Sequence, residues 1–315
     1  MKTRHTLLAS AAALALTVAA LASAGPAAST AVPSSPAGCK RPLDIVLTND
    51  DGYAAPGINA VYAALNAAGH HVAMVAPATN QTGKGGGMAY GGTLDVTHPV
   101  AGDPDIWAVG GTPADAVAFA LTALFADDEP DLVISGTNAG TNLSLVTNHS
   151  GTVGAATTAL DRGIPAIAVS TAHPAEFDAH WTGGSSYDFA GTARLVTQLV
   201  ASVARNATDC GQLLPRNVGF NVNYPSQPFR GVREATFADI DPLHTTYRRV
   251  DDDTWSVGYD LGVMQDATAT TGKVTTDYEL LARGYATVTP LDGDLSIARP
   301  SGRDNLTRKI IADLD

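Results

Sequence analysis

Two adjacent carboxylates, Asp50 and Asp51, follow directly on a mostly apolar segment, Leu43–Thr48, and are followed at once by Gly52. In open α/β sheets, ligands bind in the crevice outside the carboxyl ends of the parallel strands. Neighbouring carboxylates repel each other, and a divalent cation relieves that repulsion. This spacing therefore predicts a metal site at the end of the first strand of the fold.

Two neutral oxygen donors follow other predicted strands. Asn138 comes after Leu132–Ser135, and Thr82 lies in the glycine-rich loop Asn80–Gly87, which follows His71–Ala76. Carboxylate, amide and hydroxyl oxygens together suit a hard cation such as Mg²⁺ or Mn²⁺. Cys/His ligand spacing is absent, which disfavours zinc. Taken alone, the glycine-rich loop is better explained as a flexible surface turn.

A third loop has the composition of an anion site. The sequence His149–Ala156 has a hydroxyl and glycine turn leading into a helix of small residues. Free amides at a helix N-terminus bind anions, so Ser150, the Gly151 amide and Thr152 could hold a phosphate beside the metal. The alternative is an ordinary Ser/Thr N-cap. His149 could donate a proton to a leaving group or simply pack beside the loop.

The elements that would position these loops alternate as strand and helix, which is typical of βαβ units and a mainly parallel sheet. The capping-box pattern Thr112–Asp115, with Pro113 at the first helical position, predicts a helix start and gives Asp115 a capping role. Helices are also expected over Ile58–Ala68 and Tyr187–Arg205. The expected strands are Leu43–Thr48, His71–Ala76, Ile106–Val109, Leu132–Ser135, Ala166–Ser170 and Val218–Val222.

The chain divides into four predicted regions. Residues 1–24 have the basic, apolar and small-residue order of a secretory signal peptide, which predicts a secreted or periplasmic protein. Residues 25–38 read as a disordered spacer, 39–230 as the catalytic core, and 231–315 as a β-hairpin extension that returns to the core. The two cysteines, Cys39 and Cys210, could pair in an oxidising compartment or remain as two thiols.

The formal net charge of −12 disfavours binding to a nucleic acid polymer or, after signal cleavage, to an anionic membrane. An anionic small molecule would also be repelled at long range. A local cation in the site is therefore all the more necessary if the substrate is a phosphate ester.

An ordered series of motifs runs through most of the chain after the predicted spacer. The segments are Leu47–Ile58 (LTNDDGYAAPGI), Val75–Pro77, Asn80–Gly83, Gly111–Asp115, Pro130–Gly140, Ser150–Gly154, Gly163–Ser170, Asn221–Pro225 and Gly284–Leu291. In these segments the chain resembles the SurE (survival protein E) family of metal-dependent nucleotidases.

The resemblance implies a Rossmann-like, three-layer αβα core whose hairpin extension serves in dimerisation, giving a homodimer or a dimer of dimers. It implies hydrolysis of nucleoside 5′- and 3′-monophosphates, and in some relatives of short polyphosphate. The metal ligands carry over to Asp50, Asp51, Thr82 and Asn138, where Thr82 replaces the usual serine. The catalytic set is then Asp50, Asp51, Asn138 and Ser150, and the phosphate contacts are Asn142, Ser150, Gly151 and Thr152.

The expected mechanism is in-line attack by a metal-positioned water, with the helix N-terminus neutralising phosphate charge. A route through an aspartyl-phosphate on Asp50 or Asp51 stays open. Two other functions stay open as well. One is a broad-specificity secreted acid phosphatase or exopolyphosphatase that scavenges phosphate, and the other is a non-enzymatic nucleotide-binding module.

Overall fold

The computed structural model describes residues 38–177, 182, 187–226, 228–242, 244–260 and 275–293, all within one compact unit that begins at Pro36. The predicted signal peptide (1–24) lies outside the described residues, as does the predicted spacer (25–38) apart from Gly38. Parts of the predicted extension, 261–274 and 294–315, lie outside them too. In the described part of the chain, no helix has the length and apolar character needed to cross a bilayer.

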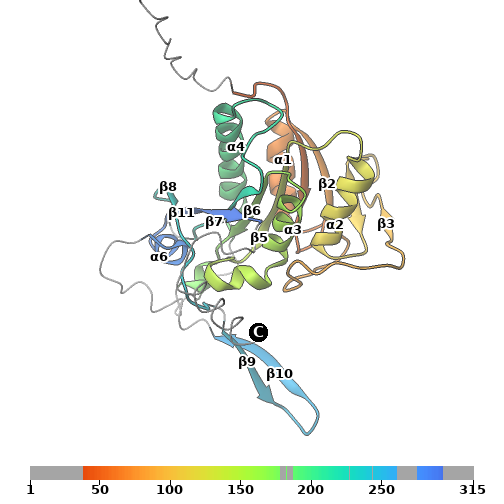
Figure 1. The fold of residues 1–315 in the computed structure, drawn as a ribbon. Helices are drawn as coiled ribbons and strands as arrows, with labels where there is room; N and C mark the ends of the chain where they lie inside the picture. Colours follow the sequence, from red (N-terminus) through yellow and green to blue (C-terminus); the bar gives the residue numbers. More distant parts are fainter. Residues whose placement is uncertain are drawn as a thin grey trace, which may run out of the picture. The chain divides into compact units, whose positions relative to one another are not determined.

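The main sheet has the strand order β3-β4-β2-β1-β5-β6-β7-β11-β8 (Figure 1). Its central strands, from β4 to β7, are parallel, while β3 is antiparallel to β4 and β11 is antiparallel to β7. The strand bounds are β1 Asp44–Thr48, β2 His71–Pro77, β3 Val96–Thr97, β4 Ile106–Val109, β5 Leu132–Ala139, β6 Ala166–Thr171, β7 Val218–Tyr224, β8 Val232–Glu234 and β11 Ala286–Asp292.

Helices cover both faces of this sheet. In strand β1, Ile45 and Leu47 pack into the core beneath α1 (Pro56–Ala67) and α4 (Phe189–Asn206), whereas Val46 faces the opposite core beneath α2 (Pro113–Phe119) and α3 (Gly151–Leu160). Successive side chains of a strand point to opposite faces, so a strand buried on both faces is apolar throughout. The predicted three-layer α/β fold is confirmed.

Local sequence signals set the helix starts. Helix α1 begins with Pro56 at its first position, and α2 has the predicted capping box, in which the Thr112 hydroxyl accepts from the Asp115 amide and the Asp115 carboxylate accepts from the Thr112 amide. Asp115 also accepts a hydrogen bond from the Ala89 amide, which fixes the end of the glycine-rich loop. The remaining helical segments are η1 Ala120–Leu124, η2 Ser144–His149, η3 Pro174–Glu176 and α6 Asp277–Ala282.

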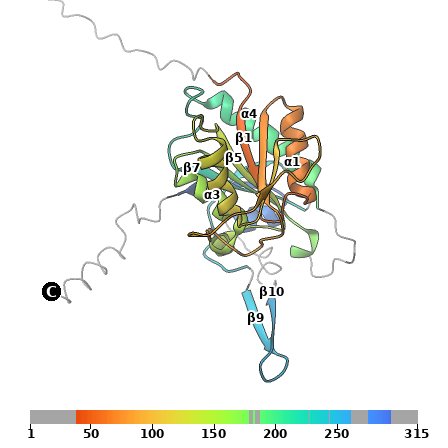
Figure 2. The same ribbon diagram turned by 90° about the vertical axis from the view of Figure 1, so that its right-hand side faces the viewer.

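The predicted hairpin is present as β9 (His244–Arg249) and β10 (Trp255–Asp260), an antiparallel pair separate from the main sheet. Figures 1 and 2 both show it extending away from the sheet. Strand β8, which lies in the sequence predicted as extension, instead pairs in parallel with β11 at the edge of the main sheet. The hairpin itself is therefore shorter than the segment predicted to form it.

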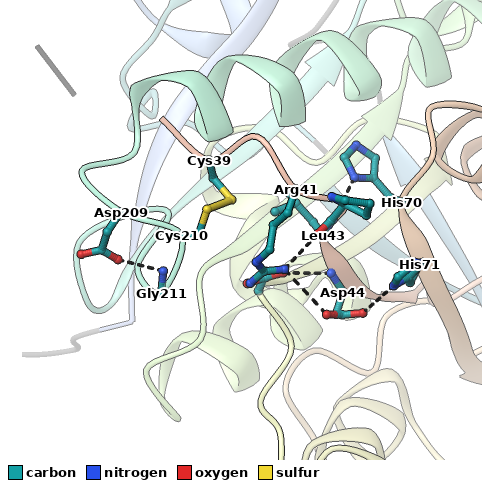
Figure 3. Close-up of polar contacts among 11 residues, drawn as sticks. Cys39, Arg41, Leu43, Asp44, His70, His71, Asp209, Cys210 and Gly211 are labelled. Carbon is teal, nitrogen blue, oxygen red and sulfur yellow. Dashed lines mark hydrogen bonds and ion pairs between the residues drawn. A yellow bond between two sulfur atoms is a disulfide. The ribbon is translucent and has the colours of Figure 1, made fainter. Parts of the chain in front are cut away.

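A disulfide joins Cys39 to Cys210, which confirms the pairing expected in an oxidising compartment (Figure 3). Cys39 is buried, and its amide donates to the carbonyl of Ala204 in α4. Beside it, the Arg41 guanidinium makes two hydrogen bonds of 2.7 and 2.6 Å to the Asp131 carboxylate. These contacts fix the chain where it enters β1, the strand that carries the carboxylate pair.

Candidate functional site

A closed turn holds the two carboxylates at the end of β1. The buried Asn49 side chain donates to the Gly52 carbonyl and accepts from the Gly52 amide, at 3.0 and 3.1 Å. Gly52 has a φ of +100°, a left-handed conformation that glycine adopts without strain. The glycine that follows the carboxylate pair is therefore required by the backbone of the turn.

Asp50 is almost completely buried, with 2% of its surface exposed. Its Oδ1 accepts a 2.8 Å hydrogen bond from the hydroxyl of Thr152. Burial raises the pKa of Asp50 from 3.8 to about 6; the Thr152 hydrogen bond opposes the rise, and the neighbouring Asp51 adds to it. The charged form of Asp50 thus lacks a compensating positive partner.

Asp51 is half-buried and accepts two hydrogen bonds. The Ala139 amide donates to its Oδ2 at 3.0 Å, and the Asn80 side chain donates to its Oδ1 at 3.3 Å. Burial raises the pKa of Asp51 as well. The side chain is therefore tied both to the end of β5 and to the glycine-rich loop after β2, which brings three strand ends to one point.

Asn138 and Thr82 border the same cavity as Asp50, a hollow of about 410 Å³. Asn138 lies in β5, which runs four residues beyond the predicted strand, and the amide nitrogen of its side chain donates to the Gly140 carbonyl at 3.0 Å. Its Oδ1 accepts no hydrogen bond from any described residue. The exposed Thr82 is oriented through its amide, which donates to Asn80. Asp50, Asn138 and Thr82 thus border one cavity, and Asp51 lies next to Asp50, tied to Asn80 and Ala139.

The chemistry of these donors fits a hard divalent cation. Within the described ranges, no Lys, Arg or His forms an ion pair with Asp50 or Asp51, and no group of three or more His, Cys, Asp or Glu comes together. A cation here would therefore meet two carboxylates and neutral oxygens, the donor type that Mg²⁺ and Mn²⁺ prefer. A buried carboxylate beside a half-buried one, with no counter-charge, is costly unless a cation is bound.

The N-terminus of α3 packs directly against Asp50. A Cβ added to Gly151 would lie 2.8 Å from Asp50 Cβ and 2.9 Å from its Oδ2, so only glycine fits there. Ser150 is the N-cap, and its Oγ accepts from the Val153 amide at 3.1 Å. Its hydroxyl proton can still be donated, so capping does not exclude a phosphate contact. Both alternatives considered for Ser150 are compatible with this geometry.

The structure gives Thr152 and Asn142 framework roles that differ from the predicted phosphate contacts. Thr152 is fully buried, and its hydroxyl donates to Asp50 rather than facing the cavity. Asn142 borders the cavity, but its side-chain NH₂ group donates to Ser170. Its backbone carbonyl accepts from the side chains of Asn221 and Asn223. Thr152 therefore positions a carboxylate, and Asn142 secures the loop after β5.

The glycine-rich loop packs against α3 instead of standing free. A Cβ on Gly154 would lie 2.4 Å from the carbonyl of Gly85, and the Gly85 amide donates to the His149 carbonyl at 3.2 Å. This close backbone approach explains the run of small residues in both segments. His149 is exposed and borders the cavity.

Three residues that sequence reasoning did not identify also border the cavity: His173, Glu176 and Tyr187. Glu176 Oε2 accepts from the amide and hydroxyl of Thr141, and its Oε1 accepts from the His173 amide at 2.6 Å. Burial raises the pKa of Glu176. His173 lies just past the carboxyl end of β6, as Asp50 does relative to β1. The expectation that functional side chains follow the carboxyl ends of parallel strands could therefore have identified His173.

A buried carboxylate outside the cavity supports one wall of it. Asp277, which is fully buried, accepts from the amides of Ser144, Ala238 and Tyr278 at 2.7 to 3.2 Å. Burial raises the pKa of Asp277. It thereby joins α6 to the start of the η2 turn, whose end leads into Ser150.

Comparison with known proteins gives consistent matches. The family model described as Survival protein SurE matches residues 45–245. Proteins named 5′-nucleotidase SurE are similar over most of the chain: the one from Nitratidesulfovibrio vulgaris is 36% identical over 255 residues (80% of this chain, 87% of that protein), and the one from Geotalea daltonii is 34% identical over 270 (81% and 94%).

A third relative of the same name, from Methanocella arvoryzae, is 41% identical over 184 residues, which cover 58% of this chain and 66% of that protein. Among solved structures, the crystal structure of the SurE protein from Aquifex aeolicus superposes with a TM-score of 0.67 at 28% identity. That match covers 86% of this chain and 99% of the Aquifex aeolicus chain.

Proposed function

The chain belongs to the survival protein SurE family, and from this membership and its site we propose that it is a nucleotidase that hydrolyses nucleoside 5′- and 3′-monophosphates with a divalent metal ion. The observation that carries the proposal is the adjacent pair of a buried Asp50 and a half-buried Asp51. Neither has a cationic partner among the described residues, and Asp50 adjoins the N-terminus of α3. Relatives named 5′-nucleotidase support the substrate class.

In this proposal, Asp50, Asp51, Asn138 and Thr82 hold Mg²⁺ or Mn²⁺. When bound, such an ion polarises a phosphoryl oxygen and lowers the pKa of a bound water. Thr82 is the one member of the set that is exposed and held only through its backbone amide. We expect its contribution to metal affinity to be smaller than that of the carboxylates.

The phosphate would lie at the N-terminus of α3. The Gly151 amide belongs to the first helical turn, where backbone N–H groups lack partners within the helix and the helix dipole favours negative charge. Ser150 would donate its hydroxyl proton to a phosphate oxygen while still capping the helix. His149, exposed at the same cavity, is the residue we propose as proton donor to the leaving alkoxide.

We favour direct attack by water over an aspartyl-phosphate. The burial of Asp50 and the hydrogen bonds that both carboxylates accept support a role in holding a cation rather than in nucleophilic attack. Rapid quenching of a reaction with ³²P-labelled AMP tests this choice. Protein-bound label that survives acid quenching and is released by hydroxylamine or alkali would overturn the water mechanism.

The experiment that tests the function measures phosphate release from 5′-AMP, 3′-AMP, p-nitrophenyl phosphate and short polyphosphate, each with Mg²⁺, Mn²⁺ or EDTA. Preferential, metal-dependent release from the two nucleotides is expected. Equal rates on all the esters, or preference for polyphosphate, would favour the scavenging phosphatase instead. If neither metal supports phosphate release, the remaining alternative is a non-enzymatic nucleotide-binding module.

We further propose that the hairpin mediates self-association into a homodimer or a dimer of dimers. Tyr247 lies opposite Val257 in the β9–β10 pair, and Trp255 lies opposite Arg249, so these side chains share one face. Tyr247, Trp255 and Val257 are 66%, 55% and 68% exposed. Large apolar side chains exposed together are typical of an interaction surface.

Export to the periplasm or beyond the cell is also proposed. The signal-like sequence of residues 1–24 suggests it, and the Cys39–Cys210 disulfide supports it because such bonds persist mainly in oxidising compartments. Mass spectrometry of the N-terminus of protein recovered outside the cytoplasm tests it. A mature chain that still begins at Met1 would contradict cleavage.

A further inference from the structure

The cavity beside Asp50 is also lined by residues of a different character. Apolar and ring-bearing residues from four separate segments of the chain contribute to its wall. These are Leu143, Val146, His173, Tyr187 and Pro242. The metal and phosphate roles proposed above use none of them, so their chemistry needs a separate explanation.

The ring of Tyr187 is held in a fixed orientation. It stacks on Phe189 at the start of α4, with ring centroids 5.2 Å apart and planes inclined by 12°. It also packs against the His173 ring at 5.0 Å and an angle of 58°. A pre-oriented aromatic ring in a cavity wall offers a surface for another flat ring at little entropic cost.

The His173 ring is fixed both in place and in tautomer. Its Nδ1 accepts a 3.1 Å hydrogen bond from the Ala175 amide, so the proton of the neutral ring lies on Nε2. Its backbone amide donates to Glu176, whose carboxylate also accepts from Thr141, another residue that lines the cavity. His173 therefore brings a defined N–H donor to the wall beside Tyr187.

We propose that Tyr187 and His173 form the recognition wall for the base of the substrate. In this arrangement the base packs against the Tyr187 ring, and His173 Nε2–H donates to an acceptor on the nucleoside. The inference rests on the proposed nucleotidase function, which it extends from the phosphate to the base. The cavity, at about 410 Å³, is in the size range of small-molecule sites and accommodates a nucleoside together with its phosphate.

The experiment compares 5′-AMP with ribose 5-phosphate, which has the same phosphate and sugar but no base. The ratio of their kcat/KM values is measured in the full-length mature protein, in Tyr187→Ala and in the matched control Tyr187→Phe. Loss of base stacking on an aromatic side chain typically costs about 1–3 kcal/mol, or roughly 5- to 150-fold. We expect the ratio to fall by at least about 5-fold in Tyr187→Ala and to be retained in Tyr187→Phe.

His173→Asn provides an independent variant. An asparagine oxygen can still accept from the Ala175 amide and cap the η3 turn, but it does not reproduce the Nε2–H donor at the same distance from the backbone. Adenosine binding, followed by calorimetry in EDTA, is expected to weaken in both His173→Asn and Tyr187→Ala. This readout does not depend on metal or on turnover.

The two levels of the proposal can fail separately. If the wild-type protein hydrolyses neither ester but binds adenosine through Tyr187 and His173, the nucleotidase function fails and the base-recognition wall stands. If it hydrolyses both esters and neither variant changes the AMP to ribose 5-phosphate ratio or the adenosine affinity, the recognition wall is overturned. Circular dichroism of each variant checks that the fold is intact.

Discussion

The raised pKa of Asp50 makes the stability of the metal-free protein depend on pH in a defined direction. The folded-state pKa of about 6 lies above the ordinary aspartate value of 3.8, so the folded protein binds this proton more tightly than the unfolded chain does. The resulting stabilisation is fully present below pH 3.8 and is lost as the pH rises through about 6.

The magnitude follows from the same pKa values. A tenfold change in proton affinity corresponds to about 1.4 kcal/mol, so the difference between 3.8 and about 6 corresponds to about 3 kcal/mol. Because Asp50 is only 2% exposed, solvent screening reduces this value little. Ionised Asp50 thus destabilises the metal-free fold at neutral pH, and a bound cation would remove that penalty.

Urea unfolding of wild type and Asp50→Asn in EDTA, from pH 4 to 7.5, measures the effect. Asparagine does not titrate, so any constant cost of the substitution cancels when the two pH profiles are subtracted. We expect the stability of wild type relative to the variant to fall by about 2 kcal/mol over this range, because the unfolded carboxyl is already partly ionised at pH 4. Mg²⁺ added at pH 7.5 should restore the lost stability in wild type but not in Asp50→Asn. Parallel stability profiles for the two proteins, or a rise in the relative stability of wild type with pH, would contradict the raised pKa of Asp50.

Three further predictions follow from individual contacts. Gly151→Ala should weaken Mn²⁺ binding and cost about 1–3 kcal/mol of stability, because its Cβ would lie 2.8 Å from Asp50 Cβ. The control Gly86→Ala, whose Cβ would meet nothing closer than 4.0 Å, should bind Mn²⁺ as wild type does. Equal Mn²⁺ affinities in the two variants would contradict this prediction. Replacing Cys39 and Cys210 by serine opens a link across 171 residues and should lower the free energy of unfolding by up to about 5 kcal/mol; an unchanged urea midpoint would count against it. Trp255→Glu places a charge on the exposed hairpin face and should shift light-scattering mass towards the monomer, and an unaltered oligomer would exclude this face.

The central strands could be predicted from sequence because strands buried on both faces of a parallel sheet are nearly continuous apolar runs. Ile106–Val109 is observed with the expected bounds, and β1 differs by one residue at its start. The edge strands could not be predicted this way. Strand β8, Val232–Glu234, is exposed throughout and is defined only by pairing with β11, a partner more than fifty residues away in the sequence.

Within the site, the rule that ligands gather at strand ends placed Asp50 and Asn138 at one cavity, with Asp51 beside them, from sequence alone. The direction of individual side chains could not be predicted in the same way. Thr152 is adjacent to the proposed phosphate site in sequence, yet its hydroxyl donates to Asp50. Tyr187 was expected only as a helix start, and its place in the cavity wall depends on packing between α4 and the end of β6.

The most direct test of the account is the release of phosphate from 5′-AMP by EDTA-treated protein as Mn²⁺ is added back, compared among wild type, Asp51→Asn and the surface control Asp44→Asn. The account predicts that turnover appears with Mn²⁺ in wild type and in Asp44→Asn and stays absent in Asp51→Asn. Turnover in EDTA, or an Asp51→Asn variant as active as wild type, would contradict a metal site at the end of β1.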